Sequence, residues 1–167
     1  MSVLPILTIP NPVLKQLTEK VLEFNNDLKE LVQDMFDTVA DAGGVGLAGP
    51  QAGILERIII VSFEGRKLVF INPEITWAGD EMVLAEEGCL SCPGRTIVIK
   101  RPDEIKVTAQ DIKGEPFTIK LKDWISRIVQ HEIDHLNGVL ILDREDKGDD
   151  LLKGFVFEKD ELSDHVF

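Results

Sequence analysis

The sequence has few cysteines and few basic side chains, and each shortage excludes a class of protein. Only two cysteines, Cys89 and Cys92, occur in 167 residues, too few for a disulfide-rich secreted fold. The chain has 18 lysines and arginines but 30 acidic residues. The resulting net charge of −12 disfavours duplex nucleic acid and anionic membranes as partners. No apolar run approaches the roughly 20 residues that cross a bilayer, and no signal-like segment is present. We expect a cytoplasmic protein.

The hydrophobic content is sufficient for one domain spanning residues 1–167. Hydrophobic residues make up 44% of the chain and charged residues 29%, the balance of a globular protein. Residues 143–167 hold nine acidic and four basic side chains, which predicts an acidic tail.

Hydrophobic periodicity predicts helices on either side of a strand-rich section. We expect a short turn at Pro12, a helix over 27–42 that Asp27 begins, and a helix over 124–136 capped by Asp123. Runs of β-branched residues predict strands at 58–61, 68–71, 97–99, 105–108, 117–121 and 139–142. Strands that precede one late apolar helix indicate an α+β fold, with mixed or antiparallel sheets around that central helix.

The strongest chemical motif is His131-Glu132-Ile133-Asp134-His135. Histidines four residues apart on a helix project from one face, so both rings can bind the same metal ion. Glu132 lies beside them, where a general base towards a metal-activated water is needed. Ile128 and Leu136 indicate that this helix is largely buried. Burying histidines that bind nothing would therefore cost free energy of folding. The motif therefore predicts a metal site.

A catalytic metal site of this kind needs a third protein ligand and one open position. Metalloproteases that extend the motif with a third histidine would place it at position 141, which is Ile141. Glu158 and Glu161 lie in the acidic tail, which is better explained as solvated surface. His165 lies near the terminus, where chains usually fray. Cys89 remains as the candidate ligand. A metallopeptidase is the alternative enzyme, and Ile141 disfavours it.

The two cysteines allow other roles. A redox Cys-x-x-Cys should open a helix within a βαβ unit, whereas here a Pro-Gly pair and a β-branched run follow. The serious alternative is a closed structural zinc site formed by Cys89, Cys92, His131 and His135. Such a site would make the protein a non-catalytic binding module, and Glu132 would then have no chemical role.

The segment Val45–Gln51 is too rich in glycine and proline for a regular element, and too apolar for an idle surface loop. It follows a helix and precedes a strand, which is not the order of a dinucleotide-binding fingerprint. Its glycines would let the backbone approach a ligand, and the Gln51 amide can donate to a developing oxyanion.

Three segments together resemble the signature motifs of peptide deformylases in order and spacing. They are Gly44-x-Gly46-Leu47-Ala48-x-x-Gln51, Glu87-Gly88-Cys89-Leu90-Ser91 and Gln130-His131-Glu132-x-Asp134-His135. The resemblance implies a metal-dependent hydrolase that removes the N-formyl group from the N-terminal formylmethionine of newly synthesised polypeptides and releases formate. It also implies one divalent metal ion, natively Fe²⁺ and alternatively Zn²⁺ or Ni²⁺.

The same resemblance assigns roles to individual residues. It implies that Glu132 is the general base and acid. It also implies that the Gln51 side chain and the Leu90 backbone N–H donate hydrogen bonds to the oxyanion. It also implies that Glu87 and Arg101 orient a histidine or pair with Asp134. The implied metal ligands are Cys89, His131 and His135.

The substrate peptide is implied to bind as an added extended strand. Its backbone would lie beside Val45, Gly46 and Gly88. Its methionine side chain would enter an apolar pocket near the central helix, formed by Val45, Trp124 and Ile128.

Two departures from the family pattern bear on function. Gly49 stands where the family commonly has alanine, a change predicted to loosen the loop beside Gln51. Many bacterial members end in a basic helix that docks on the ribosome, whereas the tail 143–167 is acidic and RNA would repel it. The expected partners are therefore N-formylmethionyl nascent peptides, with transient proximity to the ribosome and no direct docking by this tail.

Overall fold

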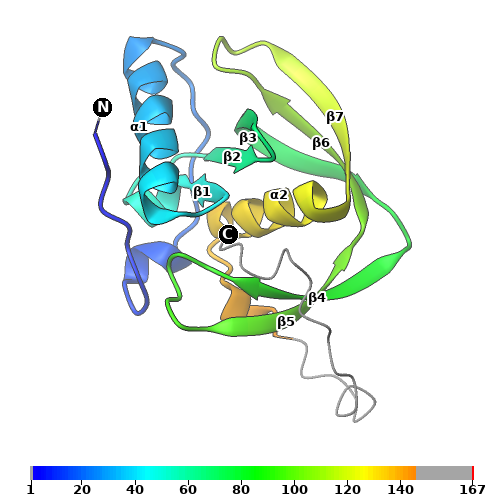
Figure 1. Ribbon diagram of the computed structural model, residues 1–167. Helices are drawn as coiled ribbons and strands as arrows, with labels where there is room; N and C mark the ends of the chain where they lie inside the picture. Colours follow the sequence, from blue (N-terminus) through cyan, green and yellow to red (C-terminus); the bar gives the residue numbers. More distant parts are fainter. Residues whose placement is uncertain (1, 146–166) are drawn as a thin grey trace.

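The computed structural model describes residues 2–145 and residue 167, and these are arranged around one central helix (Figure 1). The strands are β1 Gly46–Ala48, β2 Ile58–Phe63, β3 Arg66–Ala78, β4 Met82–Gly88, β5 Thr96–Pro102, β6 Glu104–Gln110 and β7 Pro116–Lys122. The helices are α1 Asn26–Ala42 and α2 Asp123–Leu136, with 3₁₀ turns η1 Pro12–Lys15, η2 Gly49–Ala52 and η3 Ile141–Asp143. The predicted α+β class is confirmed.

The strands form two antiparallel sheets. One has five strands in the order β1-β2-β3-β6-β7, and the other is the β4–β5 hairpin. In Figure 1 the central helix α2 lies between the large sheet and this hairpin. Among the described residues, no helix is long and apolar enough to cross a membrane.

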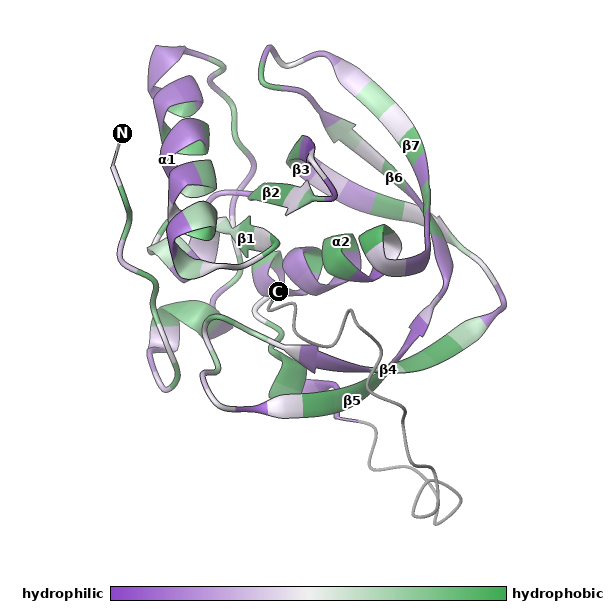
Figure 2. Cartoon of the chain, viewed as in Figure 1, coloured by the Kyte–Doolittle hydropathy of each residue, from purple (hydrophilic) through white to green (hydrophobic). Residues whose placement is uncertain are grey.

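Strand β2 shows why one helix packs on each face of the large sheet. Ile58 and Ile60 pack with α1, whereas Ile59 and Val61 pack with α2. All four side chains are completely buried. A strand that is covered on both faces carries a continuous apolar run, in contrast to the alternating pattern of a half-exposed strand. Figure 2 accordingly shows β2 largely green, while α1 is green only in part.

Strand β6 alternates apolar and polar residues, as expected for a strand with one solvent-exposed face. Ile105 and Val107 are buried in the cluster around α2, whereas Lys106 between them is exposed. The outer part of the large sheet therefore encloses α2 from one side only. Every residue of α2 from Ser126 onward is buried, because the β4–β5 hairpin covers the other side of the helix.

The helix starts differ from those predicted. The side chain that caps α1 is Asn25, whose Oδ1 accepts a hydrogen bond of 3.0 Å from Leu28 N, so the assignment of Asp27 to this position was wrong. Helix α2 includes Asp123, which has a φ of 61°. The position before it is Lys122, whose side chain makes no capping hydrogen bond. Neighbouring polar residues compete for such caps, and only backbone geometry decides between them.

The segment 139–142, predicted as a strand, is not one. It leads into the 3₁₀ turn Ile141–Asp143, where Leu140 N donates to Asp143 Oδ2 at 2.9 Å. Two strands were also missed. β1 lies within the glycine-rich segment that was predicted to be irregular. β4 contains Glu86 and Glu87 just before its last residue, and their charges concealed its strand pattern.

Candidate metal centre

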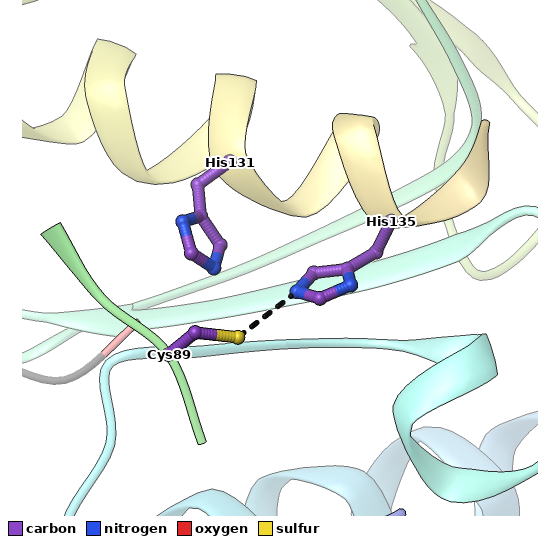
Figure 3. A group of neighbouring side chains, drawn as sticks. All are labelled: Cys89, His131 and His135. Carbon is purple, nitrogen blue, oxygen red and sulfur yellow. Dashed lines mark hydrogen bonds between the residues drawn. The ribbon is translucent and has the colours of Figure 1, made fainter. Parts of the chain in front are cut away.

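The structure brings Cys89, His131 and His135 together. Both histidines project from α2 towards Cys89, which immediately follows β4 (Figure 3). Their ligand atoms all lie within 4.8 Å of one another, and Cys89 Sγ is 3.4 Å from His135 Nε2. All three side chains are at most 2% exposed. Two nitrogens and one sulfur around a common centre form a donor set for a divalent transition metal.

The protonation of the histidines fits such an ion. His131 Nδ1 is 2.9 Å from the carboxylate oxygen Glu87 Oε1, which can only accept, so Nδ1 carries the proton. His131 Nε2 is buried without a hydrogen-bond partner among the described residues, so no neighbour there competes with a metal ion for it. Burial lowers the pKa of His135 well below its usual value, and the nearby charge of Arg101 lowers it further. Burial therefore favours the neutral form of His135, and both histidines offer a ring nitrogen to the candidate centre.

Glu132 is a buried carboxyl group beside this centre. It is completely inaccessible to solvent, and neither carboxylate oxygen has a partner within the described part of the chain. Burial, followed by repulsion from Glu87, raises the pKa of Glu132 well above its usual value. A carboxyl group with a raised pKa can both take up and release a proton near neutrality, which is the property of a general base and acid.

Gly46 provides the space in which the Glu132 carboxylate lies. A Cβ atom at position 46 would lie 2.6 Å from Glu132 Oε1 and 3.0 Å from its Cδ. Strand β1 can thus approach α2 only with glycine at this position. The sequence pattern suggested Gly46 as a backbone contact for a ligand, and the structure adds this second constraint.

Glu87 connects the centre to a buried charge network. Its carboxylate accepts hydrogen bonds from Arg101 Nε at 2.6 Å, Arg101 Nη2 at 3.0 Å and Arg127 Nη1 at 2.6 Å, besides its contact with His131. Burial alone would raise the pKa of Glu87, but the hydrogen bonds from His131 and Arg101 and the charge of Arg101 hold it well below its usual range. Glu87 is therefore ionised and fixes the orientation of the His131 ring.

The same network contains one predicted contact and one residue that was missed. Arg101 Nη1 donates to Asp134 Oδ2 at 2.9 Å, so Arg101 joins Glu87 to Asp134. Arg127 was not anticipated. Besides Glu87, it donates to Val83 O at 2.7 Å and Ile99 O at 3.1 Å, and it thereby ties α2 to both strands of the hairpin. The sequence did contain an indication of this role for Arg127, because a basic residue one helical turn before His131 is unusual on a helix that is otherwise buried.

We expect Glu87→Gln to weaken metal binding roughly 10- to 100-fold, the usual effect of losing the partner of a liganding histidine. The amide keeps the shape of the side chain but leaves the buried Arg101 and Arg127 without their shared counter-charge, so the melting temperature should also fall. Chelator competition and thermal unfolding measure the two effects. Glu86→Gln is the matched control, because Glu86 is the exposed neighbour on β4. Equal metal affinity in both variants would refute this role of Glu87.

The two predicted oxyanion donors lie beside the centre. Gln51 is completely buried, its Oε1 accepts from Ala48 N at 2.9 Å, and its Nε2 lies 3.8 Å from Cys89 Sγ and 3.2 Å from Ser91 Oγ. The Leu90 N–H donates to the carbonyl of Phe167 at 3.0 Å. Both donors therefore flank Cys89, one from η2 and one from the segment after β4.

The residues predicted to bind substrate also gather around α2. Val45 and Ile128 are buried in one hydrophobic cluster, against which Trp124 packs. Gly46 lies in β1 and Gly88 ends β4, so the two predicted backbone contacts come from different sheets.

Cys92 does not join the three-residue donor group. It is buried in the apolar cluster that contains Leu14 and Ile97, and its N–H donates to Cys89 O at 3.0 Å. Within the described residues, the closed four-ligand zinc site is therefore not formed, and one position remains open for a further ligand.

Gly49 does not loosen its loop, contrary to expectation. A Cβ atom there would lie 2.6 Å from Ile54 O and 2.7 Å from Glu56 O, so the chain packs against the space that a methyl group would fill. The Ile54 N–H also donates to Gly49 O at 2.9 Å. The segment that carries Gln51 is consequently closed against the chain that follows it.

Comparison with known proteins identifies the family of this chain. The model of the polypeptide deformylase family matches residues 3–150. The peptide deformylase of Wolbachia sp. subsp. Drosophila simulans (strain wRi) is 42% identical over 155 residues, covering 85% of this chain and 87% of the relative. That of Dictyoglomus turgidum (strain DSM 6724 / Z-1310) is 46% identical over 142 residues, covering 85% and 92%.

Solved structures give the same result at the level of the fold. The crystal structure of peptide deformylase from Thermotoga maritima matches with a TM-score of 0.85 and 39% identity, over 87% of this chain and 99% of that one. The resemblance carried by the three sequence motifs is confirmed, and the chain belongs to the peptide deformylase family, a family of enzymes.

Proposed function

We propose that this chain removes the N-formyl group from N-formylmethionyl nascent peptides and releases formate, using one divalent metal ion. The main support is the buried cluster in which Cys89 Sγ, His131 Nε2 and His135 Nε2 converge beside the Glu132 carboxylate, which has no hydrogen-bond partner among the described residues. Membership of the family supplies the reaction, and the cluster supplies groups suited to it. The catalytic unit is one domain, and its place of action is the cytoplasm.

The proposed ligands are Cys89, His131 and His135. A donor set of one thiolate and two imidazoles suits Fe²⁺, Zn²⁺ or Ni²⁺ better than the hard cations Mg²⁺ and Ca²⁺, and we propose Fe²⁺ as the native ion. When bound, such an ion supplies Lewis acidity, which lowers the pKa of water to near neutrality and polarises a carbonyl group.

Glu132 carries the proton through the reaction. One carboxylate oxygen takes a proton from the attacking water, whose oxygen forms a bond to the formyl carbon. When the bond between that carbon and the peptide nitrogen breaks, Glu132 returns the proton to the leaving amine. Its burial in a site closed by Gly46 keeps bulk water from competing for this proton.

Two hydrogen-bond donors hold the charge that develops on the formyl oxygen. The Gln51 amide is fixed by its bond to Ala48 N, so its Nε2 faces the region of Cys89. The Leu90 N–H approaches from the opposite segment. Donors that are already oriented need no reorganisation as charge develops. The peptide is proposed to extend between the chain segments at Gly46 and Gly88, with its methionine beside Trp124.

The decisive experiment is a formate-release assay on N-formyl-Met-Ala-Ser with anaerobically purified, metal-loaded protein. We expect one formate for each new amino terminus. Mass spectrometry of the same reaction tests the metallopeptidase alternative, which predicts cleavage between amino acids. Full metal occupancy without any formate would refute the proposed function.

Gly46→Ala should lower kcat by roughly 100-fold, because displacing a reacting group by about 1 Å costs that much. The added methyl group would overlap the Glu132 carboxylate, which must move. Metal content should be unchanged, since the ligands are not touched. Gly79→Ala is the matched control, because its Cβ would have no neighbour closer than 3.4 Å. A normal kcat in Gly46→Ala would show that Glu132 does not need this space.

A further inference from the structure

Phe167, the last residue that the structure describes, lies against the proposed active site. Its side chain is only 1% exposed. The ring centroid is 5.6 Å from that of Trp124 and 5.3 Å from that of His131. In Figure 1 the C-terminal end of the chain accordingly lies beside α2.

The backbone of Phe167 pairs with the segment that follows β4. Its N–H donates to Gly88 O at 3.3 Å, and its carbonyl accepts from Leu90 N at 3.0 Å. The residue therefore bonds on both sides of Cys89, as one residue of an added strand would. Its neighbours are Gly88, Leu90 and Trp124, which are among the residues proposed to contact the substrate.

We propose that Phe167 is an internal ligand of the substrate site, where it takes the place of the substrate's N-terminal residue. This inference rests on the proposed function. The Leu90 N–H cannot donate to the Phe167 carbonyl and to a developing oxyanion at once. The Phe167 ring also covers the side of Trp124 and His131 that a methionine side chain would approach. Substrate must therefore displace Phe167 before it reacts, and the chain restrains its own activity.

Competition between Phe167 and substrate for one site leads to a kinetic prediction. If the site is free of Phe167 in only about a tenth of the molecules, the apparent affinity for substrate falls about 10-fold. Phe167→Ala in the full chain should then lower KM about 10-fold and leave kcat within a factor of about two. Phe167→Met should keep a KM close to that of the unaltered chain, because a methionine fits the same place.

The control separates competition from simple loss of packing. Phe24→Ala removes a phenyl ring elsewhere in the fold, one that is partly buried against the cluster around α1, and its KM should not change. If Phe167 had only a structural role, Phe167→Ala would lower the melting temperature and leave KM equal or higher, and that result would overturn the proposal. A KM of the unaltered chain that rises with enzyme concentration would assign the contact to a second copy and would also overturn it.

A binding measurement tests the inference without catalysis. The chain has two tryptophans, so Trp77→Phe leaves Trp124 as the only fluorescent indole. Titration of this background with the product peptide Met-Ala-Ser should give a dissociation constant about 10-fold lower when Phe167→Ala is added. Equal constants, or no binding by either protein, would overturn the inference. Absence of formate release together with a 10-fold difference in binding would refute the proposed function alone.

Discussion

Glu132→Gln should lower kcat for formate release by about 10²- to 10⁴-fold, the usual contribution of a general acid–base group. Glutamine has nearly the same shape as glutamate but cannot accept and return a proton. Its metal content should match that of the unaltered chain, since Glu132 is not one of the three clustered donors. Metal analysis and steady-state kinetics on the same preparation measure the two properties. Glu56→Gln, at an exposed position, is the control.

The same substitution should stabilise the metal-free protein at neutral pH. The pKa of Glu132 is raised by folding, so ionisation of this group destabilises the folded state increasingly as pH rises above the unfolded value. Glutamine cannot ionise and removes this penalty. The melting temperature of Glu132→Gln should therefore exceed that of the unaltered chain at pH 7 to 8 and approach it near pH 4.

The kinetic measurement has a separate refuting outcome. If Glu132→Gln kept more than a tenth of the normal kcat, Glu132 would not be the general base and acid.

Cys89→Ala should abolish stable metal binding, whereas Cys92→Ala should leave it intact. Within the described part of the chain Cys89 offers one of three clustered donors, and two histidines alone do not complete a tetrahedral site. Cys92 is equally buried and shares an apolar cluster with Cys89, but it is not one of the three clustered donors. Because both substitutions remove the same thiol from a buried position, the pair controls for packing loss.

Metal stoichiometry after dialysis measures this difference directly. We expect close to one ion per chain in Cys92→Ala and less than about a tenth of that in Cys89→Ala, with formate release lost in parallel. The structural zinc module predicts that both substitutions release the metal. Equal loss in the two variants would therefore support that alternative and contradict the proposed enzyme.

Local interactions account for what was predictable about the site. The spacing of His131 and His135 determines that both face the same side of a helix, because a turn of α-helix contains 3.6 residues. Their identity and order with Cys89 and Gln51 resemble the motifs of one family, and the comparisons show that the chain belongs to that family. Glu87 could be linked to a histidine from the motif, but a charged residue on a strand is usually solvated, so sequence alone did not reveal its burial among two arginines.

The sequence by itself determined the α+β class, most of the strands, the central helix and the three residues that cluster in the candidate metal centre. These follow from periodicity and motif spacing, which depend on neighbours along the chain. Only the tertiary structure decided that Gly46 must be small and that Phe167 lies beside Trp124. Such contacts join segments that are distant in sequence, and their free energy depends on pairing and packing that no local pattern records.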